Sequence, residues 1–123
     1  MLLDDERLLL DLYVEAFSNA GYAPVAYTSG HEAIAQLKSG NVPDVILFDI
    51  NMPEMDGFTF LETVKHGNLA PNAVTVALTN ESKEEDTKRT MDLGATGHFV
   101  KSQLSPSDVV EAVRGLLEKQ KTN

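Results

Sequence analysis

Cysteine is absent from the chain, and so is any apolar run that approaches the roughly 20 residues of a membrane span. The N-terminus also lacks a basic segment followed by an apolar stretch and a cleavage site, which is the pattern of a secretory signal. Disulfides are rare in the reducing cytoplasm, so the absence of cysteine agrees with that location. We therefore expect a cytoplasmic protein without a membrane partner.

Basic residues are also few. Ten Lys and Arg against nineteen Asp and Glu give a net charge of −9 at pH 7, which argues against direct binding of nucleic acid. For most of the carboxylates, solubility is the simpler role. Hydrophobic residues make up 42% of the sequence, an ordinary share for a globular protein. A chain of 123 residues is long enough for one core, so we expect a single domain over residues 1–123.

One stretch, residues 45–57, organises the rest of the sequence. It reads VILFDINMPEMDG, and its four apolar residues run without alternation into Asp49. Such a run, bounded by turn residues, is typical of a strand that is buried on both faces. Asp49 is therefore expected at the carboxyl end of a parallel strand, which is where open α/β sheets bind their ligands.

Strand and helix patterns alternate along the whole chain. Short strands are expected at 1–3, 23–27, 45–49, 74–78 and 97–100. Helices are expected at 6–20, 29–38, 57–66, about 85–93 and 105–119, the fourth being the most polar and a polar tail following the last. Ser29 and Ser105 are expected as helix caps. The first helix is expected to turn one stripe to the core, formed by Leu8, Leu9, Leu12, Ala16 and Phe17.

Polar side chains end four of the five expected strands. They are Asp4 and Asp5 after the first, Asp49 after the third, Thr79 after the fourth and Lys101 after the fifth. In a parallel sheet all carboxyl ends lie on one edge, so these side chains are expected to converge. Three close carboxylates repel unless a cation lies among them, and oxygen ligands suit Mg²⁺ or Mn²⁺. A cation, a lysine and a hydroxyl around a carboxylate are what a phosphoryl group needs.

The acidic pair at 4–5 and the segments FDINMPEMDG, VALTN and GHFVK follow each other at a characteristic spacing. With these motifs the whole chain resembles the receiver domain of bacterial two-component response regulators, in the layout of the stand-alone chemotaxis type. The resemblance implies a flavodoxin-like α/β fold, a doubly wound five-stranded parallel sheet in the order 2-1-3-4-5 with helices on both faces. It also implies a phosphorelay switch, loaded by a histidine kinase, a phosphotransfer protein or a small phosphodonor.

The same resemblance assigns roles to the residues at the strand ends. Asp49 resembles the phospho-acceptor, which becomes an acyl phosphate. Asp4 and Asp5 resemble the metal-binding pair, with Asp5 as the direct ligand. The backbone carbonyl of Asn51 is expected as the third protein ligand beside Asp49. Lys101 resembles the lysine that pairs with the phosphoryl group.

Further positions resemble the switch of the family. Thr79 resembles the hydroxyl that swings in to hold a phosphoryl oxygen after the reaction. His98 stands where the family usually has Tyr or Phe, the ring that turns inward as Thr79 moves, and its protonation near neutral pH bears on that movement. Asn51 and Glu81 lie two residues beyond Asp49 and Thr79, at positions that set the lifetime of the acyl phosphate. The pair resembles that of short-lived regulators, so we expect fast self-dephosphorylation.

The sequence departs from the family pattern at three places. The first strand is a few residues shorter than usual. Ser102 follows Lys101 where many receivers have Pro, and because a cis bond before Ser would cost about 2.5–4 kcal/mol, a trans bond is expected. Asn80 follows Thr79 where a small residue is usual, and it is expected to narrow access to the phosphoryl group.

The leading hypothesis is a switch that catalyses its own phosphorylation and dephosphorylation but turns over no metabolite. One alternative is a receiver-like interaction module that is not phosphorylated. Another is a phosphohydrolase of the haloacid dehalogenase type. That family has a second Asp two residues after the nucleophile, where this chain has Asn51. The kinase, the output process, the extent of the whole regulator and the oligomeric state, including a homodimer through the last strand and helices, stay open.

Overall fold

The computed structural model describes residues 1–80 and 83–121, which form five strands and five α-helices. The strands are β1 (Leu2–Leu3), β2 (Ala26–Tyr27), β3 (Val45–Asp49), β4 (Val74–Thr79) and β5 (Gly97–Val100). The α-helices are α1 (Arg7–Asn19), α2 (Gly30–Lys38), α3 (Gly57–His66), α4 (Glu84–Asp92) and α5 (Pro106–Lys121). A short 3₁₀ helix, η1 (Lys101–Gln103), joins β5 to the loop before α5.

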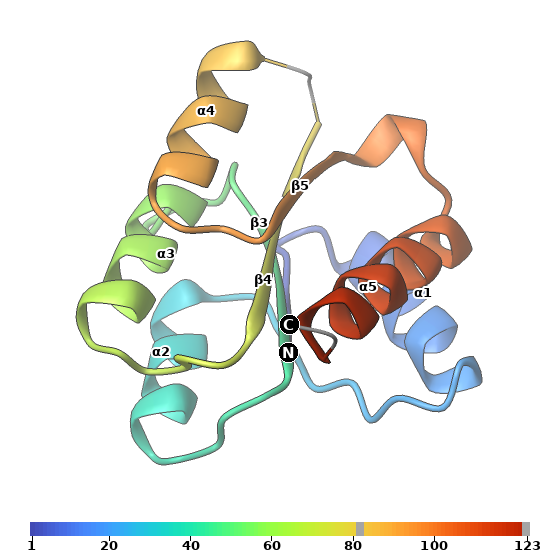
Figure 1. Cartoon of the computed structure of the whole chain (residues 1–123), viewed down its shortest axis with the longest axis horizontal. Helices are drawn as coiled ribbons and strands as arrows, with labels where there is room; N and C mark the ends of the chain where they lie inside the picture. The colour runs from blue at the N-terminus through green and yellow to red at the C-terminus, as the bar shows by residue number, and fades with distance from the viewer. Residues whose placement is uncertain (81–82, 122–123) are drawn as a thin grey trace.

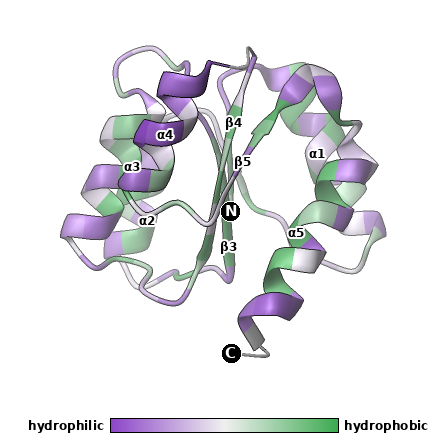
Figure 2. Cartoon of the chain, turned by 45° about the horizontal axis from the view of Figure 1, so that its top comes forward, coloured by the Kyte–Doolittle hydropathy of each residue, from purple (hydrophilic) through white to green (hydrophobic). Residues whose placement is uncertain are grey.

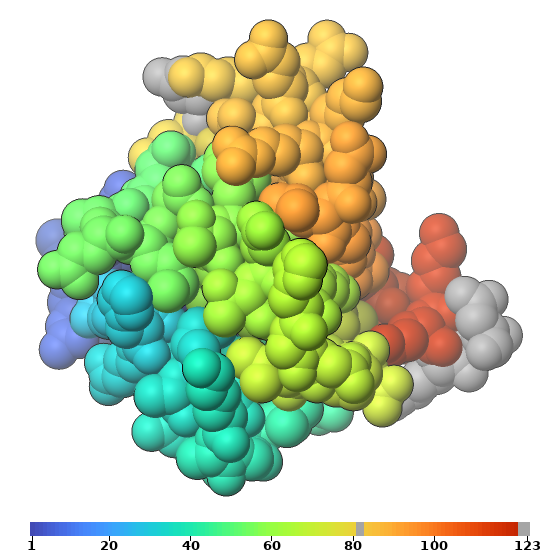
Figure 3. Space-filling model, turned by 90° about the vertical axis from the view of Figure 1, so that its left-hand side faces the viewer, coloured from blue at the N-terminus to red at the C-terminus, as the bar shows by residue number. Residues whose placement is uncertain are grey.

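The strands form one parallel sheet in the order β2-β1-β3-β4-β5. Helices α1 and α5 cover one face, and α2, α3 and α4 cover the other (Figure 1). Figure 3 views the second face, with α4 at the top, α3 in the middle and α2 below. The predicted strand order and the predicted covering of both faces are confirmed.

The central strands carry the core on both sides. Ile46 and Phe48 of β3 pack into the cluster beneath α2 and α3, whereas Leu47 packs into the cluster beneath α1 and α5. All three side chains are buried, and every residue of β4 is buried as well. Figure 2 shows this distribution, with apolar residues along the central strands and hydrophilic ones over the outer helix surfaces. The unalternating apolar runs are therefore strands buried from two sides, as predicted.

Local capping explains where several helices begin. The Ser29 hydroxyl accepts a hydrogen bond from the backbone N–H of Glu32, and Asp56 accepts one from Thr59 at the start of α3. Ser105 and Asp108 bond to each other's backbone N–H groups, which closes a reciprocal capping box before α5. These side chains satisfy donors that the first helical turn leaves without partners.

Some element bounds differ from the prediction. The first strand is short, as expected, with two residues in the ladder. The second strand is shorter than the predicted 23–27, because only Ala26 and Tyr27 pair with β1. The last helix runs on to Lys121 instead of ending near 119. The peptide bond between Lys101 and Ser102 is trans, since the described residues contain no cis bond.

The buried face of α1 differs from the predicted one. Leu8 is 84% exposed and Leu12 is 51% exposed, whereas Leu10 and Tyr13 are each 1% exposed. Only Phe17 belongs to both the predicted and the observed buried stripe. Because residues 8–10 are all leucine, the sequence offers two apolar stripes with the same helical spacing. The rotation of the helix was decided by the packing of Tyr13 and Phe17 against the sheet and α5.

The polar helix α4 is the least buried of the set, as predicted from its composition. Thr90 is its one fully buried side chain. Within residues 1–80 and 83–121, none of the helices has both the length and the apolar character that a membrane crossing needs.

A pair of substitutions tests the observed rotation of α1. We expect Leu10→Ala to lower the free energy of unfolding by roughly 2–5 kcal/mol, because it leaves a cavity in the core. Leu8→Ala is expected to change it by less than about 0.5 kcal/mol, because Leu8 lies in solvent. Urea unfolding followed by circular dichroism measures both, and equal losses for the two variants would contradict this packing.

Candidate functional site

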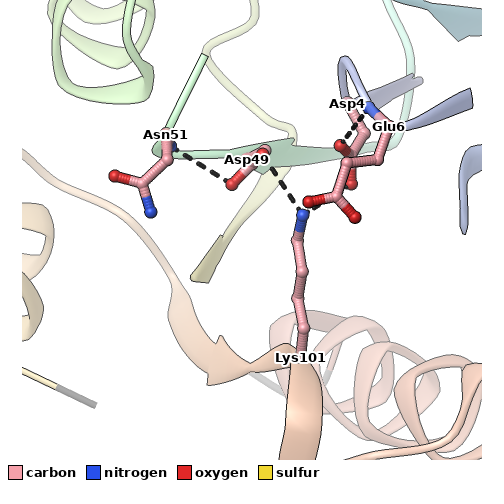
Figure 4. A network of polar contacts seen from close by, with 5 residues as sticks. All are labelled: Asp4, Glu6, Asp49, Asn51 and Lys101. Atoms are coloured by element: carbon pink, nitrogen blue, oxygen red, sulfur yellow. Dashed lines mark hydrogen bonds and ion pairs between the residues drawn. The ribbon is translucent and has the colours of Figure 1, made fainter. Parts of the chain in front are cut away.

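The carboxyl edge of the sheet brings together side chains from four parts of the chain. Asp4 follows β1, Asp49 ends β3, Thr79 ends β4 and Lys101 follows β5. Asp4, Asp49 and Thr79 are each at most 1% exposed, whereas Asp5 is exposed. The predicted convergence is confirmed by direct contacts of Lys101 with Asp4 and Asp49 (Figure 4). A carboxylate oxygen of Asp5 lies within 4.8 Å of oxygens of Asp4 and Asp49.

The ammonium of Lys101 lies between two carboxylates. Its Nζ is 2.9 Å from Oδ2 of Asp4 and 3.2 Å from Oδ2 of Asp49. All three side chains are almost completely withdrawn from water. A buried charge is tolerated only where opposite charges or hydrogen bonds compensate it, so the three groups depend on one another.

Backbone groups hold the two carboxylates in place. The N–H of Asn51 donates to Oδ1 of Asp49 at 3.2 Å, and the N–H of Glu6 donates to Oδ1 of Asp4 at 2.9 Å. The loop after β3 folds back so closely that a Cβ on Gly57 would lie 2.6 Å from the carbonyl oxygen of Asp49. Glycine at 57 is therefore a steric requirement for the turn that presents Asp49 and Asn51.

Burial and the neighbouring charges shift the titration of both central groups. Burial raises the pKa of Asp49 to about 6, with Asp4 adding to the rise while Lys101 and the Asn51 N–H oppose it. Burial alone would lower the pKa of Lys101, but the carboxylates of Asp4 and Asp49 outweigh it and raise the pKa. Lys101 thus stays a cation at neutral pH, and the Asp49 carboxylate takes up a proton at a higher pH than an ordinary aspartate does.

The acidic side chains offer a cation site. Carboxylate oxygens of Asp4, Asp5 and Asp49 lie within 4.8 Å of one another. One lysine does not neutralise three carboxylates, so the edge keeps an excess of negative charge that a divalent cation would balance. The donors are all oxygen, which is the ligand type that Mg²⁺ and Mn²⁺ take. The residues present therefore fit such an ion.

A cavity of about 240 Å³ adjoins this site. Its lining residues are Asn51, Thr79, Asn80, Lys83 and Asp86. Asn80 thus borders the space next to Thr79, and its narrowing of the approach to the phosphoryl group stays a prediction. Glu81, which the sequence pairs with Asn51 as a determinant of phosphate lifetime, lies outside the described residues.

His98 lies on β5, apart from the acidic cluster. It pairs in register with Ala77 of β4, and its ring is partly buried with Nε2 inside the protein.

Sequence reasoning missed Asp86 and Lys83 as lining residues of the cavity beside Thr79. The available signal was their place at the start of the helix that follows Thr79, but their own residue types suggested only a solvated helix face.

The fold and this edge define a flavodoxin-like α/β protein with a cluster of three aspartates at the carboxyl edge of its sheet. The family model of the response regulator receiver domain matches residues 1–114, so the chain belongs to this family. Receiver domains work in two-component signalling, where they bind Mg²⁺ at an acidic pocket, and they are generally switches and not classical enzymes.

Known proteins agree with this membership. The chain is 33% identical over 121 residues to the response regulator SaeR of Staphylococcus aureus, covering 98% of this chain and 51% of SaeR. It thus spans about half the length of the curated relatives it matches. A CheY-like receiver domain from Methanospirillum hungatei has a TM-score of 0.88 at 25% identity, covering 98% of this chain and 94% of that one. The chemotaxis response regulator CheY4 of Vibrio cholerae has a TM-score of 0.83 at 28% identity, and the match covers 94% of this chain and 94% of that one.

The raised pKa of Asp49 leads to a prediction about stability. With a folded pKa of about 6 against 3.8 in the unfolded chain, ionised Asp49 destabilises the metal-free protein at pH 7 by up to about 3 kcal/mol. Asp49→Asn, which mimics the protonated carboxyl, is therefore expected to be more stable than the wild type at pH 7. The difference should shrink as the pH falls through 6 and vanish below about 4, where the wild type is protonated in both states.

Denaturant unfolding in EDTA at a series of pH values measures this difference. Asp11→Asn serves as the control, because Asp11 is an exposed residue of α1 and its removal should change stability by less than about 0.5 kcal/mol. An Asp49→Asn variant that is less stable than the wild type at pH 7 would show that the ionised carboxylate is favourably compensated in the folded protein.

Proposed function

We propose that this receiver domain is a phospho-acceptor switch that carries the phosphoryl group on Asp49. The observation that carries the proposal is the fully buried Asp49 carboxylate at the end of β3, paired at 3.2 Å with Lys101. A carboxylate of this kind is held in one orientation, with one oxygen bonded to the Asn51 N–H. Fixed orientation of the attacking group is a large part of the rate of such a transfer.

In the proposed reaction an oxygen of Asp49 attacks phosphorus of a phosphohistidine on a histidine kinase or phosphotransfer protein. A P–O bond forms as the P–N bond breaks, and the imidazole leaves with its electron pair and takes a proton from solvent. With a small donor such as acetyl phosphate, the broken bond is P–O and acetate leaves. Hydrolysis of the acyl phosphate by water restores the Asp49 carboxylate and releases phosphate.

Lys101 and the acidic neighbours have separate roles in this proposal. Lys101 lies within ion-pair distance of Asp49, so its ammonium is placed to pair with a phosphoryl oxygen as negative charge builds up there. Both oxygens of Asp4 already have partners, in Glu6 N–H and Lys101, whereas Asp5 is exposed. This difference supports Asp5 as the direct ligand of the cation.

Asp4, Asp5, Asp49 and the backbone carbonyl of Asn51 would hold Mg²⁺ or Mn²⁺. When bound, such an ion neutralises the carboxylates and stabilises the charge of the transferring phosphoryl group. The protein's own contribution is to keep the oxygen donors together, which the bonds from Glu6 and Asn51 N–H groups do before any ion arrives.

The proposed output of the reaction is a change of the surface formed by α4 and β5. Thr79 borders the cavity beside Asp49, so its hydroxyl has room to turn toward a phosphoryl group. His98 on β5 is the proposed ring that follows this movement. Since α4 buries little beyond Thr90, its position is only weakly held and is easily biased by a new charge nearby.

Intact-mass spectrometry after incubation with acetyl phosphate and Mg²⁺ tests the proposal. We expect the wild type to gain one phosphoryl group, Asp49→Asn to gain none and Asp11→Asn to react normally. Lys101→Met is expected to slow the reaction on the order of 100-fold, because it removes a charge that pairs with the phosphoryl group. EDTA should abolish the reaction.

A wild type that gains no phosphoryl group would favour the alternative of an interaction module without phosphorylation. Steady release of phosphate from a phosphate monoester would instead favour a phosphohydrolase.

The acyl phosphate is expected to be short-lived, as the residues Asn51 and Glu81 indicate. After removal of the donor, loss of the added mass over time measures its lifetime in Mg²⁺. Asn80→Ala is expected to shorten the lifetime further, because Asn80 lines the same cavity as Thr79 and Asn51 and a smaller side chain there leaves more room for an attacking water. A wild-type half-life of many hours would contradict the first expectation, and an unchanged lifetime in Asn80→Ala would contradict the second.

A further inference from the structure

The imidazole of His98 lies in an unusual setting on β5. Its strand neighbours Gly97 and Phe99 face the α5 side, where a Cβ on Gly97 would lie 3.2 Å from Leu116. His98 alternates with them and pairs with Ala77, which belongs to the cluster on the opposite side. The ring therefore faces the layer that contains α4, where Nε2 is buried and has no hydrogen-bond partner among the described residues.

Helix α4 presents one carboxylate on the side that faces β5. Thr90 is its fully buried residue, and Asp86 lies one turn earlier on the same side, with the Thr90 hydroxyl donating to the Asp86 carbonyl. The Asp86 side chain is partly buried and lines the cavity that Asn51 and Thr79 also line. Asp86 also lies in the first turn of α4, where the helix dipole stabilises a negative charge.

Asp86 is the charged group that acts on His98. Burial lowers the pKa of His98, and the negative charge of Asp86 opposes that shift. On the packed elements, β4 has no ionisable side chain, and Arg89 of α4 stacks 4.1 Å from the Phe58 ring on α3. Lys83 lines the same cavity as Asp86.

We propose that Asp86 is a positioning residue for His98 and that the two form a proton-dependent element of the switch. A neutral imidazole occupies the buried position between β4 and α4. A protonated ring carries a donor on each nitrogen, and the buried Nε2 has no acceptor there, so the charged ring moves to the Asp86 carboxylate.

The regulatory part of this inference rests on the proposed function. If phosphorylation of Asp49 draws Thr79 and then the His98 ring inward, the phosphorylated state prefers the neutral ring. By linkage, the factor by which the phosphorylated conformation weakens proton binding to His98 is also the factor by which protonation of His98 favours the unphosphorylated conformation. Acidification would weaken the output of the switch through His98, independently of its effect on Asp49.

Histidine titration by NMR tests the pairing in the unphosphorylated protein. His31 and His66 are exposed and serve as internal references. We expect the pKa of His98 to lie below the usual range of an imidazole, and Asp86→Asn to lower its midpoint further without shifting the other two signals. Glu85→Gln is the matched control, because it removes a carboxylate next in sequence that is exposed. An unchanged His98 midpoint in Asp86→Asn, or an equal shift in Glu85→Gln, would overturn the pairing.

The same titration after loading with acetyl phosphate and Mg²⁺ tests the link to phosphorylation. Mass spectrometry on each sample reports whether Asp49 carries phosphate. The inference is supported if the titration midpoint of His98 falls when Asp49 is phosphorylated and falls less in Asp86→Asn than in the wild type. The midpoints of His31 and His66 should not change on phosphorylation.

A loaded protein whose His98 midpoint does not move refutes the inference and leaves the proposed function intact. A protein that takes no phosphate refutes the proposed function, and the titration of the unphosphorylated variants then decides the Asp86–His98 pairing by itself.

Discussion

The contact of Lys101 with two buried carboxylates is the interaction on which the rest of the structure depends. It joins the end of β5 to the ends of β1 and β3, so three strands that are distant in sequence must be in register for it to form. Without the ammonium, Asp4 and Asp49 would repel each other inside the protein, and without the carboxylates the lysine would be an uncompensated buried charge. The site therefore exists only in the folded sheet. It keeps an excess of negative charge, which a bound cation would balance.

The site is rigid on one side and loosely held on the other. Asp4 and Asp49 are fixed by backbone N–H groups, and Gly57 holds the loop after β3 in contact with the strand. Across the cavity, α4 is polar and buries little beyond Thr90. A charge added to Asp49 would thus be attached to a fixed side chain and would lie near the weakly packed helix α4. This combination allows a local chemical change to alter a protein surface.

Much of the fold was predictable because buried parallel strands leave a clear pattern. The apolar runs ending in Asp49 and Thr79 gave the central strands, and the polar residues at the strand ends predicted which side chains meet. The rotation of α1 was not predictable, since three successive leucines present two equivalent stripes and only contact with the sheet selects Leu10 over Leu8. Asp86 was missed for a related reason, because the sequence of a polar helix does not show which of its carboxylates is half-buried and lines the cavity beside Thr79.

The sequence by itself determined the alternation of strands and helices and the acidic residues at the strand ends, because these follow from local patterns and spacing. The strand order came from the resemblance to receiver domains, which the motifs at those strand ends carry. Only the tertiary structure decided the distances from Lys101 to Asp4 and Asp49, the raised pKa of Asp49 and the side of α4 that faces His98. These properties depend on burial and on contacts between distant segments, and neither exists before the sheet has formed.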